Sequence, residues 1–322
     1  MIIFDRESRS GFPIFFVVME KFEINILGCG SALPTTRHLP SAQVVNFRDK
    51  LFMVDCGEGT QLQLRRMRLK FTRLCHLFVS HMHGDHCFGL PGMLSTLGLL
   101  GRTGEFVIHA HPDAEKVFRP MLDYFCKDLP FEVRFNSVDP ASHGLIYEDR
   151  GVEVYSLPLK HRMPTMGFLF KEKQKERHLR PDMIAFWKIP IRDLQSIKEG
   201  ADWVTPDGDI VPNGALTKPA EASRSYAYCS DTAYHEPLIP LIEGVDLLYH
   251  EATFAEDAAP RAKETFHSTA RQAATIAKKA SVKQLMIGHF SARYEDDSLL
   301  LKEAQSIFPK TILAKEGLKH SL

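Results

Sequence analysis

The stretch VSHMHGDHCF, residues 79–88, places three histidines and one aspartate within six consecutive positions. Imidazole and carboxylate groups are the ligands that zinc and similar divalent ions take in catalytic sites, which keep open coordination positions. His81 and His83 are two residues apart, so in extended backbone both project from one face and can share an ion. The following glycine lets the chain turn, which directs Asp85 and His86 to a neighbouring point. The spacing therefore predicts two adjacent metal ions, and a solvated histidine-rich turn is the alternative.

The elements predicted around this cluster place it at the end of a strand. An apolar run over 74–79 precedes it, and CFGLPGMLSTLGLL after it predicts a turn followed by a helix. Three other predicted strands also end at a possible ligand, namely His161, Asp231 and His289. Each of them alone would more often be an ordinary loop residue. Together with the cluster they predict one shared site at the carboxyl ends of several strands.

The whole chain sets limits on the class of protein. With 322 residues and 44% hydrophobic content it can bury one large core or two modest ones. Lys plus Arg equals Asp plus Glu, so any contact with a polyanion must come from local basic clusters. Six cysteines without a C-x-x-C pair fit reduced thiols in a cytoplasmic protein. No apolar run reaches the ~18 residues of a membrane span, so we expect no membrane partner.

The remaining chain alternates predicted strands and helices, which indicates an α/β fold. Strands are expected near 22–27, 42–46, 51–54, 74–79, 106–110, 152–157, 166–170, 226–229, 247–250 and 284–288, and helices over 58–67, from 95, over 114–126 and over 269–280. Residues 171–219 break this rhythm because they are rich in charge, proline and glycine. We expect them to form an arm inserted in one domain, 19–322, with 1–18 as an N-terminal extension.

Several stretches carry a family resemblance: LGCGSALP, FMVDCGEGTQLQL, SHMHGDHCFGLPG, YCSDTAY, YHEATF, FHSTARQAA and GHFSARY. With them the chain resembles the metallo-β-lactamase superfamily and, within it, the ribonuclease Z family of tRNA 3′-processing endoribonucleases. The resemblance runs from about Lys21 almost to the C-terminus. HEATF and FHST are more specific to this family than the histidine cluster, which many hydrolases of the same fold share.

The resemblance implies an αββα four-layer sandwich, with two central sheets flanked by helices and the metals at one edge. It further implies a homodimer and two zinc ions per subunit, which manganese or iron(II) could replace with these ligand types. The implied ligands are His81, His83 and His161 for one ion, Asp85, His86 and His289 for the other, and Asp231 as a bridge between the two.

The implied reaction is hydrolysis of a phosphodiester in precursor tRNA, which removes the 3′ trailer and leaves a 3′-hydroxyl. Paired zinc ions would lower the pKa of a bound water, and Asp85 would orient that water and accept its proton. His267 in FHST would protonate the leaving ribose oxygen, while Glu251 in HEATF could orient an imidazole or merely fix a turn. Ser268 and Thr269 are expected to cap the next helix and to contact substrate.

Two basic clusters are candidate phosphate contacts. LRRMRLKFTR contains Arg65 and Arg66, and KEKQKERHLR contains Lys171 and Lys173. A solvated charged face is the alternative for both, and for the second cluster it is favoured by the interleaved glutamates. Two departures from the family bear on substrate recognition. The arm stretch WKIPIRDLQSIKEGADW lacks a Gly-Pro tip, and His38 stands where relatives commonly carry asparagine.

Two further functions remain open at this point. A phosphodiesterase of the same fold that acts on small or cyclic nucleotides would not need the arm. A catalytically silent, metal-stabilised RNA-binding protein would have no reason to keep a carboxylate-bridged pair of open metal sites. A thioester hydrolase or a lactamase is disfavoured, because neither needs the acid of the FHST stretch.

Overall fold

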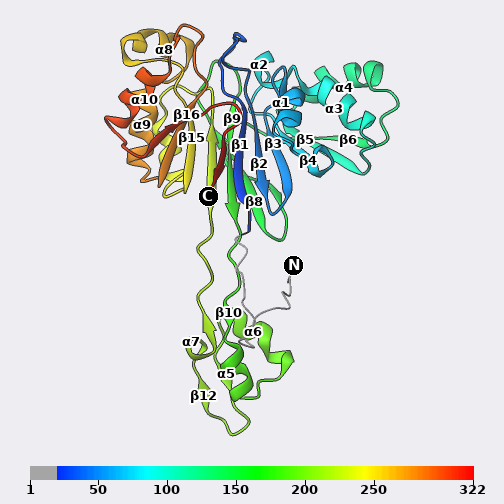
Figure 1. The fold of residues 1–322 in the computed structure, drawn as a ribbon, viewed down its shortest axis with the longest axis vertical. Helices are drawn as coiled ribbons and strands as arrows, with labels where there is room; N and C mark the ends of the chain where they lie inside the picture. Colours follow the sequence, from blue (N-terminus) through cyan, green and yellow to red (C-terminus); the bar gives the residue numbers. More distant parts are fainter. Residues whose placement is uncertain (1–19) are drawn as a thin grey trace, which may run out of the picture.

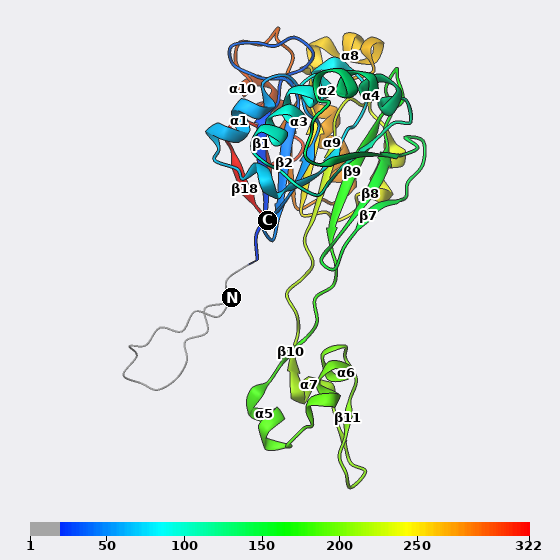
Figure 2. The ribbon, with the colours of Figure 1, turned by 90° about the vertical axis from the view of Figure 1, so that its right-hand side faces the viewer.

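The computed structural model describes residues 20–322, so the predicted extension over 1–18 lies outside the described residues. Two seven-stranded sheets face each other at the centre of the body, and helices cover their outer faces (Figures 1 and 2). The strand order is β18-β1-β2-β3-β4-β5-β6 in one sheet and β17-β16-β15-β14-β9-β8-β7 in the other. This arrangement confirms the αββα sandwich predicted from the sequence.

The first sheet and its helices come mainly from the N-terminal half. Its strands are β1 (Phe22–Gly28), β2 (Ala42–Phe47), β3 (Lys50–Val54), β4 (Leu74–Phe78), β5 (Glu105–Ala110), β6 (Glu132–Ser137) and β18 (Lys319–Ser321). Its helices are α1 (Thr60–Arg66), α2 (Gly84–Cys87), α3 (Leu90–Leu99) and α4 (Asp113–Phe125), with a 3₁₀ turn over Phe71–Arg73. α3 begins at residue 90, earlier than the predicted helix from 95, because Pro91 is well placed in its first turn.

The second sheet comes from the C-terminal half. Its strands are β7 (Leu145–Glu148), β8 (Val152–Pro158), β9 (Met166–Glu172), β14 (Ser225–Cys229), β15 (Leu247–Glu251), β16 (Gln284–Gly288) and β17 (Thr311–Leu313). Its helices are α8 (Ala259–Thr265), α9 (Ala270–Lys279) and α10 (Ser298–Gln305), with 3₁₀ turns over Glu236–Leu241 and Glu256–Ala258. Among residues 20–322 no helix is long and apolar enough to cross a membrane.

The central strands are apolar on both faces because both faces are covered. In β3, Phe52 and Val54 join the core between the sheets, while Leu51 and Met53 join the core under the outer helices. The ring of Phe52 lies 6.0 Å from that of Phe170 in the opposite sheet. A strand that is buried on both sides has a continuous apolar sequence, which explains why residues 51–54 (LFMV) show no alternation of polar and apolar residues.

The chain between β9 and β14 leaves the body and folds into a separate arm (Figures 1 and 2). The arm contains β10 (His178–Leu179), α5 (Pro181–Phe186), α6 (Leu194–Lys198), β11 (Trp203–Val204), β12 (Ile210–Val211), α7 (Asn213–Leu216) and β13 (Thr217–Lys218), with a 3₁₀ turn over Ile191–Asp193. Its small core consists of Ile189, Ile197, Trp203, Val211 and Leu216. The first residues of the predicted arm, Lys171 and Glu172, instead extend β9 in the body.

The arm and the predicted metal ligands lie at opposite ends of the same strands. β9 follows the loop that holds His161 and runs into the arm, and β14 returns from the arm and ends before Asp231. β9 has seven residues, so at about 3.3 Å per residue it spans roughly 23 Å. The folded arm therefore begins more than one strand length away from the site.

Candidate metal centre

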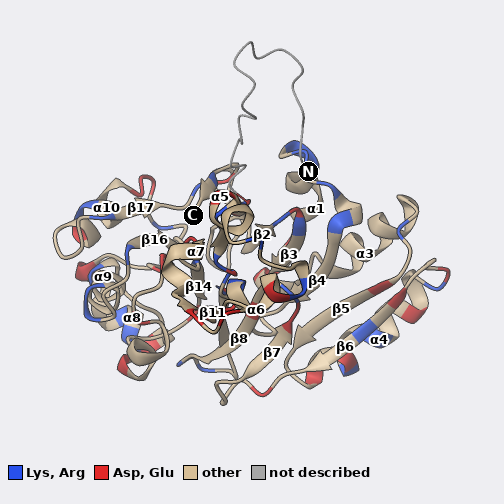
Figure 3. Cartoon of the chain, turned by 90° about the horizontal axis from the view of Figure 1, so that it is seen from below, with Lys and Arg blue, Asp and Glu red and all other residues tan. Residues whose placement is uncertain are grey.

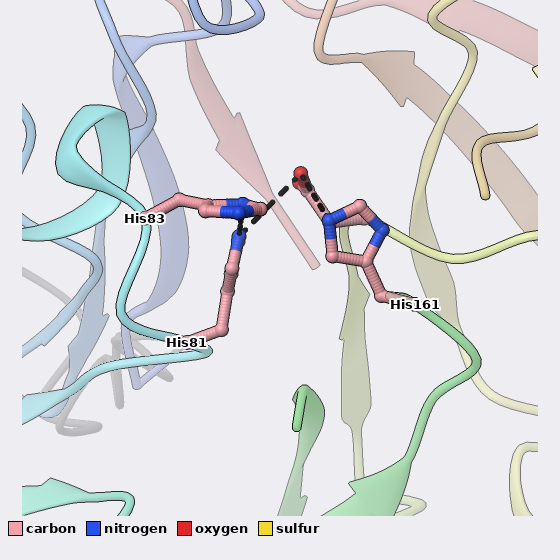
Figure 4. Close-up of side chains that lie close together, drawn as sticks. His81, His83 and His161 are labelled. Atoms are coloured by element: carbon pink, nitrogen blue, oxygen red, sulfur yellow. Dashed lines mark hydrogen bonds and ion pairs between the residues drawn. The ribbon is translucent and has the colours of Figure 1, made fainter. Parts of the chain in front are cut away.

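The structure brings four of the predicted ligands together into one group. Figure 4 shows His81, His83 and His161 pointing toward one another around a carboxylate. His81 Nε2 lies 2.8 Å from His83 Nδ1. Asp231 Oδ2 lies 3.6 Å from His81 Nε2 and 4.0 Å from His161 Nε2. One ligand atom from each of the four residues lies within 4.8 Å of the others, so a single ion could contact all of them.

A second group of predicted ligands lies beside the first. His86 Nε2 is 3.4 Å from Asp85 Oδ2, and His289 Nε2 is 3.7 Å from the same oxygen. The other oxygen of Asp231, Oδ1, is 3.2 Å from His86 Nε2 and 3.1 Å from His289 Nε2. The two oxygens of Asp231 thus face different groups, which is the geometry of a bridging carboxylate.

Buried nitrogens in these groups fit a divalent cation. The Nε2 atoms of His86, His161 and His289 are buried and have no hydrogen-bond partner among residues 20–322. Leaving a buried polar atom unpaired costs about 1–3 kcal/mol, and an ion would remove that cost. Burial, followed by the neighbouring His86, holds the pKa of His81 well below its usual value, which keeps this imidazole neutral as a ligand must be. The imidazole and carboxylate donors suit zinc and similar divalent ions.

Asp55 orients the ligand His86 through the ring nitrogen that faces away from the metal site. This carboxylate is fully buried, and its Oδ2 accepts hydrogen bonds from His86 Nδ1 at 2.7 Å and from the Tyr228 hydroxyl at 2.7 Å. Its Oδ1 accepts the backbone N–H of Ser80 at 2.7 Å. Because the proton of His86 is held at Nδ1, its Nε2 is free to bind a metal.

The other ligands have comparable partners. Thr253 Oγ1 lies 3.0 Å from His289 Nδ1, and His161 Nδ1 donates to the carbonyl of Phe266 at 3.1 Å. Sequence reasoning assigned no role to these supporting groups. Asp55 could have been found, because it directly follows a predicted strand inside one of the family stretches. For Thr253 and the Phe266 carbonyl no sequence signal was available.

Three functional residues within two positions of a strand end adopt left-handed backbone conformations. φ is 56° at Asp55, 61° at Asp231 and 60° at His289. For residues other than glycine this conformation costs on the order of 1–3 kcal/mol and persists only where surrounding contacts enforce it. The chain turns sharply at the same edge of both sheets, and these side chains are directed into the shared site.

His267 lies beside the two groups of predicted metal ligands and is paired with Glu251. Its Nδ1 lies 2.8 Å from Glu251 Oε1, and its ring centroid is 5.4 Å from that of His289. Glu251 is fully buried and also accepts the backbone N–H groups of Thr232 at 2.7 Å and Ser268 at 3.1 Å. Burial disfavours the imidazolium, but the charge and hydrogen bond of Glu251 outweigh it and raise the pKa of His267 to about 9.

Ser268 and Thr269 correct one expectation. Both side chains are fully buried, which leaves no surface for the predicted substrate contact. The Ser268 hydroxyl donates to the carbonyl of Thr232 at 2.6 Å. Thr269 caps α9 as expected, since its Oγ1 accepts the backbone N–H of Gln272 in a capping box. These two residues therefore hold the loop that carries His267.

The predicted basic residues differ in their surroundings. Arg65 and Arg66 lie exposed in the last turn of α1 and form no ion pair within residues 20–322. Lys171 is also exposed, whereas Lys173 is paired with Glu148 at 2.6 Å. Seen from the arm side, basic and acidic residues are interspersed around the body (Figure 3). Within the described residues, the end of α1 is thus a basic surface without compensating partners.

Curated relatives match nearly the whole chain. A ribonuclease Z of Parabacteroides distasonis is 64% identical over 304 residues, which cover 94% of this chain and 100% of the relative. A ribonuclease Z of Porphyromonas gingivalis is 54% identical over the same shares of both chains. The chain belongs to the ribonuclease Z family. As a ribonuclease Z it is an endoribonuclease that hydrolyses phosphodiester bonds.

Family models and solved structures agree with this assignment. The model of the Beta-lactamase superfamily domain matches residues 215–290, and that of the Anti-Pycsar protein Apyc1 matches residues 22–116. The human short-form tRNase Z has a TM-score of 0.67 and is 25% identical, with 93% of this chain and 98% of that chain covered. The metallo-β-lactamase fold protein YhfI of Bacillus subtilis is 19% identical with a TM-score of 0.66, which shows the fold. This fold implies a divalent metal at the centre.

Proposed function

We propose that this ribonuclease Z uses two zinc ions to remove the 3′ trailer of precursor tRNA and leave a 3′-hydroxyl. The observation that supports two ions is the bridging position of Asp231, whose Oδ2 faces His81 at 3.6 Å and whose Oδ1 faces His289 at 3.1 Å. When bound, such a pair lowers the pKa of a water toward neutrality and offsets the charge that develops on the phosphate.

Asp85 is the proposed group that orients the attacking water. Its Oδ2 accepts the backbone N–H of Ala32 at 2.8 Å, which helps to hold the carboxylate in place. Burial alone would raise the pKa of Asp85, but its neighbours His86 and His289 hold that pKa well below its usual value. An ionised carboxylate in this place can accept the proton that the water loses.

His267 is the proposed acid for the leaving ribose oxygen, which departs poorly as an alkoxide. The hydrogen bond between its Nδ1 and Glu251 Oε1 fixes the ring and leaves Nε2 to donate the proton. The buried Glu251 carboxylate also stabilises the imidazolium that has to be present before the transfer.

The arm over 178–218 is the proposed tRNA-binding element, and the basic end of α1 with Arg65 and Arg66 is a proposed phosphate contact. β9 alone spans roughly 23 Å, and residues 173–177 lie between its end and the arm, so the arm begins more than one strand length from the centre of its own subunit. We therefore propose a homodimer in which the arm of one subunit holds the tRNA that the partner subunit cleaves. Lys171 lies at the end of β9 and could extend this contact toward the body.

The test is cleavage of a precursor tRNA with a 3′ trailer by the zinc-loaded protein, with the new 3′ ends mapped. We expect a single cut near the end of the mature tRNA that leaves a 3′-hydroxyl and is lost in His267→Ala. His111→Ala is the matched control, because this histidine lies at the start of α4, outside the centre. Intact precursor together with hydrolysis of a small phosphodiester would instead support an enzyme of the same fold that acts on small nucleotides.

A further inference from the structure

A second cluster of possible metal ligands lies outside the catalytic centre. Cys29 follows β1, His38 lies in the loop between β1 and β2, and Glu316 lies between β17 and β18. Cys29 is fully buried, and the His38 and Glu316 side chains are only 10% and 16% exposed. One ligand atom from each of the three lies within 4.8 Å of the others. Three distant segments of the chain thus place thiol, imidazole and carboxylate groups around one point.

The separations within this cluster are close to those between ligands of one ion. Cys29 Sγ is 3.4 Å from His38 Nδ1, His38 Nδ1 is 3.2 Å from Glu316 Oε2, and Cys29 Sγ is 3.6 Å from Glu316 Oε1. A tetrahedral zinc with bonds of about 2.0–2.3 Å holds its ligands about 3.3–3.8 Å apart. In the catalytic centre, the oxygens of Asp85 and Asp231 lie 3.1–3.7 Å from the Nε2 atoms of His86 and His289. The two clusters therefore have similar spacing.

The outer contacts of the cluster also resemble those of the catalytic centre. His38 Nε2 is 2.9 Å from Asp297 Oδ2, so this nitrogen donates to the carboxylate and Nδ1 faces the cluster. Metal-binding histidines commonly make this contact with a carboxylate through their other nitrogen. Glu316 Oε1 accepts the backbone N–H of Leu39 at 2.9 Å, which leaves Oε2 facing His38.

The charges around the cluster favour a cation. Hydrogen bonds from Asp297 and Glu316 are the main reasons that the pKa of His38 rises to about 9. Burial, with a further contribution from Glu316, raises the pKa of the Cys29 thiol well above its usual value. A divalent ion would take the place of the imidazolium proton beside Glu316 and stabilise the thiolate, and its binding would release the Nδ1 proton of His38 and the thiol proton of Cys29 to solvent.

We propose that Cys29, His38 and Glu316 bind a divalent metal ion of borderline softness, such as zinc, at a site separate from the catalytic pair. Thiolate and imidazole ligands favour zinc over magnesium or manganese, and a water can complete the coordination. Asp297 orients His38 in this site.

The location of the site gives it a structural role. His38 belongs to the same loop as Ala32, whose backbone N–H donates to Asp85 Oδ2 at 2.8 Å. An ion that ties this loop to Cys29 at the end of β1 and to Glu316 near the C-terminus would hold Ala32 against the catalytic carboxylate. The proposal does not depend on the identity of the RNA substrate.

Cobalt(II) substitution tests the site on the full-length protein. A thiolate bound to cobalt gives an intense charge-transfer absorption in the near ultraviolet, whereas the catalytic centre offers only nitrogen and oxygen ligands. We expect this absorption in the wild-type protein and its loss in Cys29→Ser, together with a metal content lower by one equivalent per chain. Cys87→Ser is the matched control, because Cys87 is the buried cysteine that follows the ligand His86, and it should keep the absorption.

The proposal is overturned if cobalt-loaded wild-type protein shows no thiolate absorption and binds the same amount of metal as Cys29→Ser. The cluster is then an imidazolium held between two carboxylates. Persistence of the absorption in Cys29→Ser and its loss in Cys87→Ser would overturn it as well, by assigning the thiolate to another position. The decisive spectrum is that of the wild-type protein, so a folding defect in a variant cannot hide the answer. The proposed cleavage of precursor tRNA is tested in a separate assay, so its failure is distinguishable from failure of the metal-site proposal.

Discussion

The metal centre and the arm are built in opposite ways. In the centre several functional side chains are held by buried partners, as His86 is by Asp55 and His267 by Glu251, and both carboxylates are fully buried. The arm has a core of few residues and leaves large apolar side chains exposed, among them Ile191 at 88%. Chemistry needs atoms fixed to within a fraction of an ångström, whereas a surface that grips a large substrate can adapt to it.

The separation of these two regions makes each testable alone. A small phosphodiester with a good leaving group reports on the centre, while precursor tRNA reports on the centre and the arm together. The comparison predicts that changes in the metal ligands lower the turnover of both substrates and that changes in the arm lower only the cleavage of tRNA.

The largest effect is expected for Asp231→Ala, which removes the carboxylate shared by both groups of ligands. Turnover of both substrates should fall by more than the ~10²–10⁴-fold that a general acid typically contributes. Metal content and kcat/KM measure this, with the exposed Asp128→Ala as the control. A variant that keeps two bound ions and full turnover would show that Asp231 is not the bridge. Treatment of the wild-type protein with a chelator should give the same loss, reversed by zinc.

His267→Ala should lower the turnover of the two substrates to different extents, because their leaving groups differ. Cleavage of precursor tRNA should fall by about 10²–10⁴-fold, since the ribose oxygen needs a proton to leave. A small phosphodiester with a nitrophenolate leaving group does not need that proton, so its kcat should change little. Equal losses on both substrates would contradict the role as acid and point to a role in metal binding.

Replacement of residues 178–218 by a short flexible linker should affect only the large substrate. We expect kcat/KM for precursor tRNA to fall roughly 10²-fold, equivalent to about 3 kcal/mol of lost binding, and hydrolysis of the small phosphodiester to stay unchanged. The arm has its own core, so its removal should leave the body folded. Undiminished tRNA cleavage would show that the arm does not grip the substrate.

Asp55→Asn should weaken metal binding without abolishing it. The amide keeps the size of the side chain but loses the charge that holds His86, and such outer contacts are worth about 10–100-fold in metal affinity. Titration with zinc in competition with a chromophoric chelator measures the change. Asp49→Asn, an exposed carboxylate paired with Lys21, is the control. Unchanged affinity would mean that packing alone orients His86.

The smallest effect is expected for Glu251→Gln, as a shift of the pH profile. Glu251 raises the pKa of His267 to about 9, above the ordinary value of about 6.5 for histidine. The acid is active when protonated, so kcat/KM for tRNA should fall as pH rises through that pKa. Without the charge the pKa drops, and the falling limb should move to lower pH. If the falling limb does not move, the pKa that causes it belongs to a group other than His267.

The sequence patterns were enough to predict an α/β fold and one site shared by the strand-end ligands, while the αββα sandwich was predicted from the family resemblance. The reason is that these signals are local: HMHGDH spans six positions, and the other ligands each follow a recognisable apolar strand. Parallel strands end at a common edge, so the ligands that follow strands of one sheet converge there, whereas their meeting with the cluster after β4 depends on how the two sheets pack. The expected arm was also visible, as a change in composition over 171–219.

Only the tertiary structure decided which groups support those ligands. The Tyr228 hydroxyl reaches Asp55 across 173 residues of sequence, and Cys29 meets Glu316 across 287. Such contacts depend on how two sheets pack and on side-chain rotamers, which local patterns do not encode. The same holds for Ser268 and Thr269, whose burial follows from the packing of the FHST loop against the body. The local pattern determines which atoms can do the chemistry, and long-range packing determines how firmly they are held.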